Sequence, residues 1–444
     1  MKKDLTTGSV FKSIVSFSLP YLFSYFLQTL YGMADLFIIG QFNGVDSITA
    51  VSVGSQVMHM LTVMIVGLAM GSTVTIGKAV GAKQSEKASL AVGNTITLFM
   101  GVAVAVMIVL LAAVEPIVGL MSTPAEAVSE TIAYLTICFI GIPFITAYNI
   151  ISSIFRGLGD SKSPMHFIAV ACAVNILLDY LFIGVFHMGA AGAALGTALS
   201  QTVSVVVALT VIAKKKTGIE LKRDNFKPRS GTMSQMLKIG IPVALQDGFI
   251  QIAFIVITVI ANRRGLNDAA AVGIVEKIIG VVFLVPSTML STVSALSAQN
   301  IGAGKHNRAA GILRYAVLIT VGFGLIVSVA VQFAGQGVVG MFTDDAKVIV
   351  LGDQYLRAYI WDCMIAGVHF SFSGYFCAYG LSGISFLHNV LSIVCVRVPG
   401  AFLASKYFAD TLYPMGLAAP AGSLLSVIVC AAAFRLLKRR GAML

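Results

Sequence analysis

Long apolar segments alternate with short polar or glycine-rich connections along nearly the whole chain. The segments are longer than the about 20 residues that a helix needs to cross a bilayer. They are also too long and continuous for barrel strands, which alternate over about 10 residues. Twelve membrane-spanning helices are therefore predicted. Their approximate ranges are 13–39, 47–76, 88–115, 128–154, 164–186, 190–213, 235–262, 269–298, 309–334, 347–375, 384–408 and 415–437.

The composition supports a membrane protein and excludes most other classes. Of the 444 residues, 57% are hydrophobic and 11% are charged, whereas soluble domains average about 25% charged residues. So few charges cannot cover a soluble surface, and twelve spans leave little chain for a domain in water. The six cysteines never fall in CxxC spacing, so no disulfide, zinc or redox role is expected.

The positive charges indicate the topology. The chain carries a net charge of +11, and most of its Lys and Arg residues lie in alternate connections and in the linker after residue 213. Because positive residues concentrate on the cytoplasmic side, both termini are expected in the cytoplasm and the protein in the cell membrane. Topology accounts for the charge, so no nucleic-acid partner is expected.

The chain is predicted to be an internal duplication. The polar stretch KKKTGIELKRDNFKPRSGTMS separates an N-terminal lobe at 1–213, through a cytoplasmic linker at 214–234, from a C-terminal lobe at 235–444. Three pairs of segments match at an offset of 221 to 222 positions: SIVSFSLPYLF with QMLKIGIPVAL, KAVGAKQSEKAS with QNIGAGKHNRAA, and SSIFRGLGDSKS with SGYFCAYGLSGI. Two six-helix bundles with a cavity between them are the architecture of alternating access. The predicted fold class is an all-α polytopic membrane protein.

Polar side chains on three spans of the first half form a candidate site. An Asp at a helix centre costs about 2.5 to 3.5 kcal/mol on insertion scales, so Asp35 and Asp179 each require a partner or a role. Helical spacing aligns Gln28, Tyr31 and Asp35 on one face of the first span. The pairs Asn175 with Asp179 and Thr197 with Gln201 each lie one turn apart.

Two such carboxylates can act in two ways. They can supply oxygen ligands to a monovalent cation, or one of them can keep a proton because two like charges repel. The alternative without a function is that these residues satisfy one another as polar contacts between helices, at about 0.6 kcal/mol each.

The second half offers a rival site, with Asp247 and Gln251 on the seventh span and Tyr359 and Asp362 on the tenth. The match to a compact site is only approximate, because Asp247 comes early in its span. Glu276, Lys277 and Arg397 are expected to pair inside the bundle or to lie at its rim.

Several motifs resemble the multidrug and toxic compound extrusion (MATE) family over the whole length. They are the early SLP, GKAVGAKQSEKA, FRGLGDSKSP, NILLD, GAALGTALSQ and QNIGAG, in this order. The resemblance implies a polyspecific secondary exporter that exchanges organic cations for protons or sodium ions. It also implies that the cation site, with Na⁺ as one possible occupant, consists of Asp35, Asn175, Asp179 and Thr197. Gln28, Tyr31 and Asn149 resemble lining of the adjacent substrate cavity, to which Gln201 is added. Some members carry acidic residues for a C-terminal cation site.

No catalytic signature accompanies these features. The nearest approach to a phosphate loop, GSTVTIGKA, has five residues between its glycines instead of four and lacks the Ser or Thr that binds magnesium. We therefore expect no enzyme and no cofactor besides the coupling ion, H⁺ or Na⁺. The expected partners are hydrophobic organic cations and the bilayer, and the expected state is a monomer. The alternative function is a lipid-linked precursor flippase, whose cavity would need cations such as Lys277, Arg357 or Arg397.

Overall fold

A computed structural model describes residues 5–214 and 221–441. Within these ranges every regular element is a helix. The described chain divides into two compact units. The N-terminal unit covers Leu19–Leu237, and the C-terminal unit covers Leu5–Ser18 together with Lys238–Leu444. Two long helices, α1 (Val10–Phe42) and α8 (Ser230–Asn262), therefore each contribute to both units.

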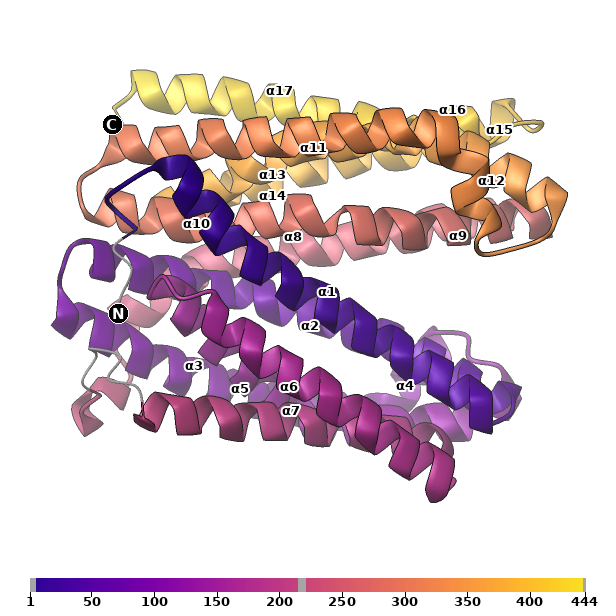
Figure 1. The fold of residues 1–444 in the computed structure, drawn as a ribbon, viewed down its shortest axis with the longest axis horizontal. Coiled ribbons are helices and arrows are strands. Elements are labelled where there is room, and N and C mark those ends of the chain that lie inside the picture. The colour runs from indigo at the N-terminus through magenta and orange to yellow at the C-terminus, as the bar shows by residue number, and fades with distance from the viewer. Residues whose placement is uncertain (1–4, 215–220, 442–444) are drawn as a thin grey trace. The chain divides into compact units, whose positions relative to one another are not determined.

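The N-terminal unit is built around α5. Besides its parts of α1 and α8, this unit contains α2 (Val45–Gly81), α3 (Ser85–Ala112), α4 (Val114–Leu120), η1 (Ala125–Ala127), α5 (Val128–Gly157), α6 (Lys162–Asp179), η2 (Tyr180–Val185), α7 (Gly189–Lys214) and η3 (Arg223–Phe226). Helix α5 packs against α2, α3 and α7, and α6 pairs with α7 (Figure 1). Its central place explains why α5 buries polar as well as apolar side chains.

The C-terminal unit repeats this plan around α13. Its elements are α9 (Leu266–Val282), α10 (Leu284–Gly302), α11 (His306–Gly340), α12 (Ala346–Tyr359), α13 (Trp361–Tyr379), α14 (Ser382–Ser392), η4 (Ile393–Arg397), α15 (Val398–Tyr407), α16 (Tyr413–Gly416) and α17 (Ala418–Arg439). Helix α13 packs against α10, α11 and α17. The elements η2 and η4 are π-helical turns, which in other proteins often mark functional sites.

The described chain contains eleven helical segments long and apolar enough to span a membrane. The one remaining predicted span, the tenth at 347–375, corresponds to α12 and α13, which are interrupted at Ile360. This segment carries Asp353, Arg357 and Asp362, so its composition is more polar than that of the others. The predicted all-helical fold of twelve spans is confirmed.

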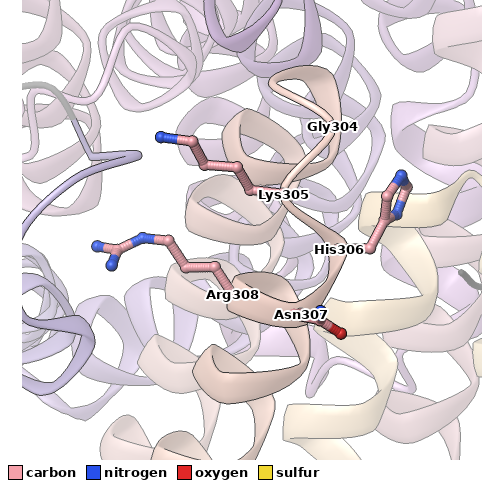
Figure 2. Close-up of a pocket in the computed structure, with 5 residues that line it drawn as sticks. All are labelled: Gly304, Lys305, His306, Asn307 and Arg308. Atoms are coloured by element: carbon pink, nitrogen blue, oxygen red, sulfur yellow. The ribbon is translucent and has the colours of Figure 1, made fainter.

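The segment before α1 is held by the loop between α10 and α11. Lys305 Nζ donates to the Thr6 carbonyl at 2.8 Å, and Arg308 donates to the carbonyls of Thr7 at 2.8 Å and Gly8 at 2.6 Å. Figure 2 shows that Lys305 and Arg308 point to one side of this loop and His306 to the other. The described residues before α1 thus pack in the C-terminal unit.

The segment before α8 is held in the N-terminal unit in a comparable way. The Asn94 amide donates to the carbonyls of Asn225 at 3.0 Å and Lys227 at 3.3 Å, and its oxygen accepts from Arg229 N at 2.7 Å. The hydrogen bond and charge of Lys227 hold the pKa of the exposed Asp224 carboxyl below its usual range. The segment that leads into each repeat therefore packs with helices of the other repeat.

Candidate functional site

Asp35 and Asp179 lie next to each other in the N-terminal unit. Asp35 comes from α1, two turns before its end, and Asp179 is the last residue of α6, where the π-helical turn η2 begins. Their exposed fractions are 5% and 0%, and the two carboxyl groups interact directly. A charge buried this deeply requires compensation.

Asn175 and Thr197 complete the group around the two acids. Thr197 Oγ1 on α7 donates to Asp35 Oδ2 at 3.2 Å. Asn175, one turn before Asp179 on α6, is fully buried and interacts with Asp35. The structure therefore brings together the four residues from three helices that were predicted to form the cation site.

Most polar atoms of this group lack a well-formed hydrogen bond. Within the described residues, Asp35 Oδ1, both carboxyl oxygens of Asp179 and both amide atoms of Asn175 are buried without a hydrogen-bonding partner. Unpaired buried oxygens are costly in a folded protein. A monovalent cation or a shared proton would satisfy them, so the donor set fits either coupling ion.

A glycine on α7 makes room for Asp179. A Cβ atom added to Gly196 would overlap Asp179 Oδ1, and α6 packs closely against α7. The sequence pattern did not single out Gly196, although it lies directly before Thr197. Its role is visible only once the two helices are placed.

The four residues predicted to line the substrate cavity differ in their surroundings. Gln28 interacts with the Tyr148 side chain, and Tyr31 interacts with both Asp35 and Tyr148. These contacts continue the polar face of α1 away from the two acids. Gln201 is buried on α7 with Oε1 unpaired within the described chain. The Asn149 amide instead donates to the Ile145 carbonyl of its own helix at 2.8 Å.

The rival C-terminal residues do not form one group. Tyr359 and Asp362 both interact with Arg397. Asp247 instead interacts with Cys377, which lies about four turns after Asp362 along α13, or about 22 Å at 1.5 Å per residue. Gln251 is half-buried one turn beyond Asp247. The structure thus pairs the two residues of the tenth span with an arginine and leaves Asp247 apart.

Two further polar groups of the C-terminal unit were not expected as sites. Glu276 accepts a hydrogen bond from Thr258 at 3.0 Å and also interacts with Arg397. The ring centroids of His369 and His388 are 5.4 Å apart, and His369 bonds to Ser423 at 3.2 Å. His388 stands alone in its sequence neighbourhood, so no spacing pattern could reveal this contact.

Comparison with known proteins agrees with the fold and the duplication. The MatE family model matches residues 20–181 and again 242–403. The chain is 28% identical over 415 residues to the probable multidrug resistance protein YpnP of Bacillus subtilis (strain 168), covering 93% of each chain. It is 25% identical over 405 residues to the multidrug export protein MepA of Staphylococcus aureus (strain MRSA252), covering 90% of this chain and 89% of MepA.

Solved structures show the same fold. A crystal structure of MATE in complex with MaL6 has a TM-score of 0.91 at 23% identity, covering 98% of this chain and 99% of the other. An outward-facing multidrug resistance MATE family transporter of the MOP superfamily also has a TM-score of 0.91 at 23% identity, with 98% of both chains covered. Since the MatE model matches most of the chain, this protein belongs to the multidrug and toxic compound extrusion family of membrane transporters.

Proposed function

We propose that this transporter exports hydrophobic organic cations in exchange for H⁺ or Na⁺, and that the coupling ion binds at Asp35, Asn175, Asp179 and Thr197. The observation that carries this proposal is the buried pair of interacting carboxyl groups, of whose four oxygens only Asp35 Oδ2 has a hydrogen-bond donor within the described residues. The relatives named for multidrug resistance and export support the substrate class.

The coupling follows from charge balance. With the ion bound, the charge of the Asp35–Asp179 pair is reduced, and with the ion released, the pair attracts a cationic compound. Ion and substrate then favour opposite states of the same two-state equilibrium, so the binding of one weakens the binding of the other. A membrane potential supplies about 2.3 kcal/mol per charge per 100 mV, so export needs no nucleotide. The transporter works as a monomer in the cell membrane with both termini in the cytoplasm, and the coupling ion is its only cofactor.

The test is uptake of a fluorescent organic cation such as ethidium into everted membrane vesicles, with a pH gradient and a sodium gradient imposed separately. One of the gradients should drive uptake by the wild type and by the control Asp46→Asn, because Asp46 is an exposed acid at the start of α2. Asp35→Asn and Asp179→Asn should each abolish it while the purified protein stays monodisperse. Full uptake by both buried-site variants would refute the proposed coupling site.

Within residues 5–214 and 221–441, no structural feature favours the flippase alternative. A lipid pyrophosphate would need available cations, but Arg357 pairs with Asp353 at 2.8 Å. Arg397 interacts with acids and tyrosines of its own unit, and Lys277 is exposed. Lack of ethidium uptake under both gradients, followed by movement of a fluorescent lipid in reconstituted vesicles, would support the flippase instead.

A further inference from the structure

The two repeats can be compared position by position. The matched segments begin at residues 20 and 242 and end at 181 and 403, so positions at both ends of the match differ by 222. At this offset the cation-site residues of the first repeat correspond to four residues of the second. Asp35, Asn175 and Asp179 correspond to Ile257, Arg397 and Ala401, respectively. Thr197 lies beyond the matched segments, and the same offset leads from it to Ala419.

Three of the corresponding residues are apolar and buried. Ile257, Ala401 and Ala419 belong to one hydrophobic cluster of the C-terminal unit. The fourth, Arg397, replaces a neutral amide with a permanent positive charge, because a guanidinium does not lose its proton in proteins. The second repeat therefore carries a positively charged side chain at a position where the first repeat carries a residue of the candidate cation site.

The partners of Arg397 come from other helices. Arg397 Nη2 donates to the Tyr359 hydroxyl, and the guanidinium carbon lies 4.8 Å from the centre of the Phe254 ring. The Arg397 charge also interacts with Asp362 and Glu276, and Asp362 is 1% exposed. Two acids, a tyrosine and an aromatic face are the groups that bind a guanidinium ion.

Several polar atoms of Arg397 and its neighbouring acids have no hydrogen-bonding partner, which is expected of a cation-binding site but not of a closed ion pair. Within the described chain, Asp362 Oδ1, Glu276 Oε1 and Arg397 Nε are buried without a hydrogen-bonding partner. No N–O distance within 4.0 Å joins Arg397 to either acid among the described salt bridges. The acids therefore interact with the guanidinium charge without forming a closed ion pair with it.

We propose that Phe254, Glu276, Tyr359 and Asp362 form a cation-binding site in the C-terminal unit and that the Arg397 side chain occupies it as a tethered ligand. The tethered guanidinium excludes a free cation from these acids. This proposal rests on the proposed antiport in one respect, because it confines the coupling ion to the N-terminal site. Removing the side chain opens the C-terminal site to free guanidinium.

The chain's single tryptophan gives a direct readout. Trp361 is next to Asp362 and packs against the cluster that contains Tyr359. The experiment titrates purified protein in nanodiscs with guanidinium chloride at millimolar, non-denaturing concentrations and follows Trp361 fluorescence. The Asp35→Asn substitution is present throughout, so that the N-terminal site does not contribute. No gradient or transport is needed, so failure of this proposal is distinct from failure of the antiport.

Arg397→Ala should give a saturable fluorescence change with guanidinium, at a half-saturating concentration about tenfold lower than with tetramethylammonium. The control Arg397→Lys keeps a tethered cation and should give none. Adding Glu276→Gln to Arg397→Ala should raise the half-saturating concentration. Absence of a saturable change in folded Arg397→Ala would overturn the proposal.

The protein with Arg397 intact provides a second test that does not depend on the folding of Arg397→Ala. With Asp35→Asn alone, Trp361 should not respond to sodium, potassium or guanidinium. A saturable response to any of these ions at constant ionic strength would show that the acids are open to free cations. That result would overturn the proposal by itself.

Discussion

Asp179 Oδ1 occupies the space that a side chain at Gly196 would fill. The matching contact of the C-terminal unit pairs Gly400 with Ala418, and a Cβ atom added to Gly400 would lie 3.3 Å from the Ala418 Cβ. Each repeat thus keeps a glycine at this close contact, but on opposite helices. Only the first repeat uses the space for a carboxyl group.

Gly196→Ala should therefore displace Asp179 from the candidate cation site. Overpacking of this kind costs about 1 to 3 kcal/mol, and the carboxyl group has little room to move because it is fully buried. We expect gradient-driven uptake to fall at least about tenfold, which corresponds to about 1.4 kcal/mol, with a modest drop in thermal stability. The control Gly101→Ala places its methyl group in open space on α3. Equal uptake by Gly196→Ala and the control would show that the contact is irrelevant to coupling.

Thr197→Val should change the affinity of the candidate site for the coupling ion. Proton binding should tighten, because the hydrogen bond that is lost stabilises the ionised form of Asp35, whereas Na⁺ binding should weaken, because the ion loses a proposed oxygen ligand. The substitution keeps the side-chain shape but removes the donor to Asp35 Oδ2, and an unpaired buried acceptor costs about 1 to 3 kcal/mol. The ion concentration that half-saturates transport should change by about tenfold, while Thr197→Ser, which keeps a hydroxyl, should stay near the wild type. The measurement is transport rate against pH or sodium concentration. If Thr197→Val leaves the half-saturating ion concentration unchanged, the hydrogen bond between Thr197 and Asp35 does not contribute to ion binding.

The sequence was sufficient to predict the fold and much of the candidate site. The length of the apolar segments predicts the membrane spans, and one-turn spacing places Asn175 with Asp179 on one face of α6. Asp35 has Tyr31 one turn earlier on its own helix but no second acid or amide of the cation site, so its meeting with Asp179 depended on the assumption that the polar faces converge. The structure brings them together because buried polar groups of neighbouring helices have few other partners.

The surroundings of Arg397 could not be predicted in the same way. Its partners come from α8, α9, α12 and α13, which share no periodic pattern with η4. The interruption at Ile360, between Tyr359 and Asp362, also breaks the spacing that would indicate a common face. The segments that lead into α1 and α8 are held through backbone carbonyls, and such contacts leave no residue signature in the segment that is bound.

Asn94→Ala should release the linker segment from α3. The substitution removes two hydrogen bonds to linker carbonyls and the acceptor for Arg229 N. The bonds after Arg223 and Arg229 should then be cut faster by trypsin, because proteolysis requires a backbone free to leave its partners. Limited trypsin digestion of the purified protein measures this. The control Asn307→Ala changes an exposed asparagine in the first turn of α11 and should leave the digestion rate unchanged. No difference between the two variants would contradict the prediction.

Arg264→Ala should destabilise the C-terminal unit strongly. The side chains of Arg264 and Asp268 are 6% and 13% exposed, and their bond measures 2.7 Å. The guanidinium also donates to the carbonyl of Ser405 in the last turn of α15 and to three carbonyls between α15 and α16, those of Phe408, Ala409 and Thr411.

Removing Arg264 leaves a buried carboxylate unpaired, and breaking a buried pair costs about 3 to 5 kcal/mol. We therefore expect a clear fall in the midpoint of thermal unfolding followed by Trp361 fluorescence. Arg264→Lys should recover only part of the loss, because an ammonium cannot reproduce the planar fork that reaches several carbonyls. The neighbouring Arg263 is exposed, so Arg263→Ala is the matched control and should unfold like the wild type. Equal midpoints for the two alanine variants would mean that the carbonyl contacts of Arg264 do not hold the connection between α15 and α16 in place.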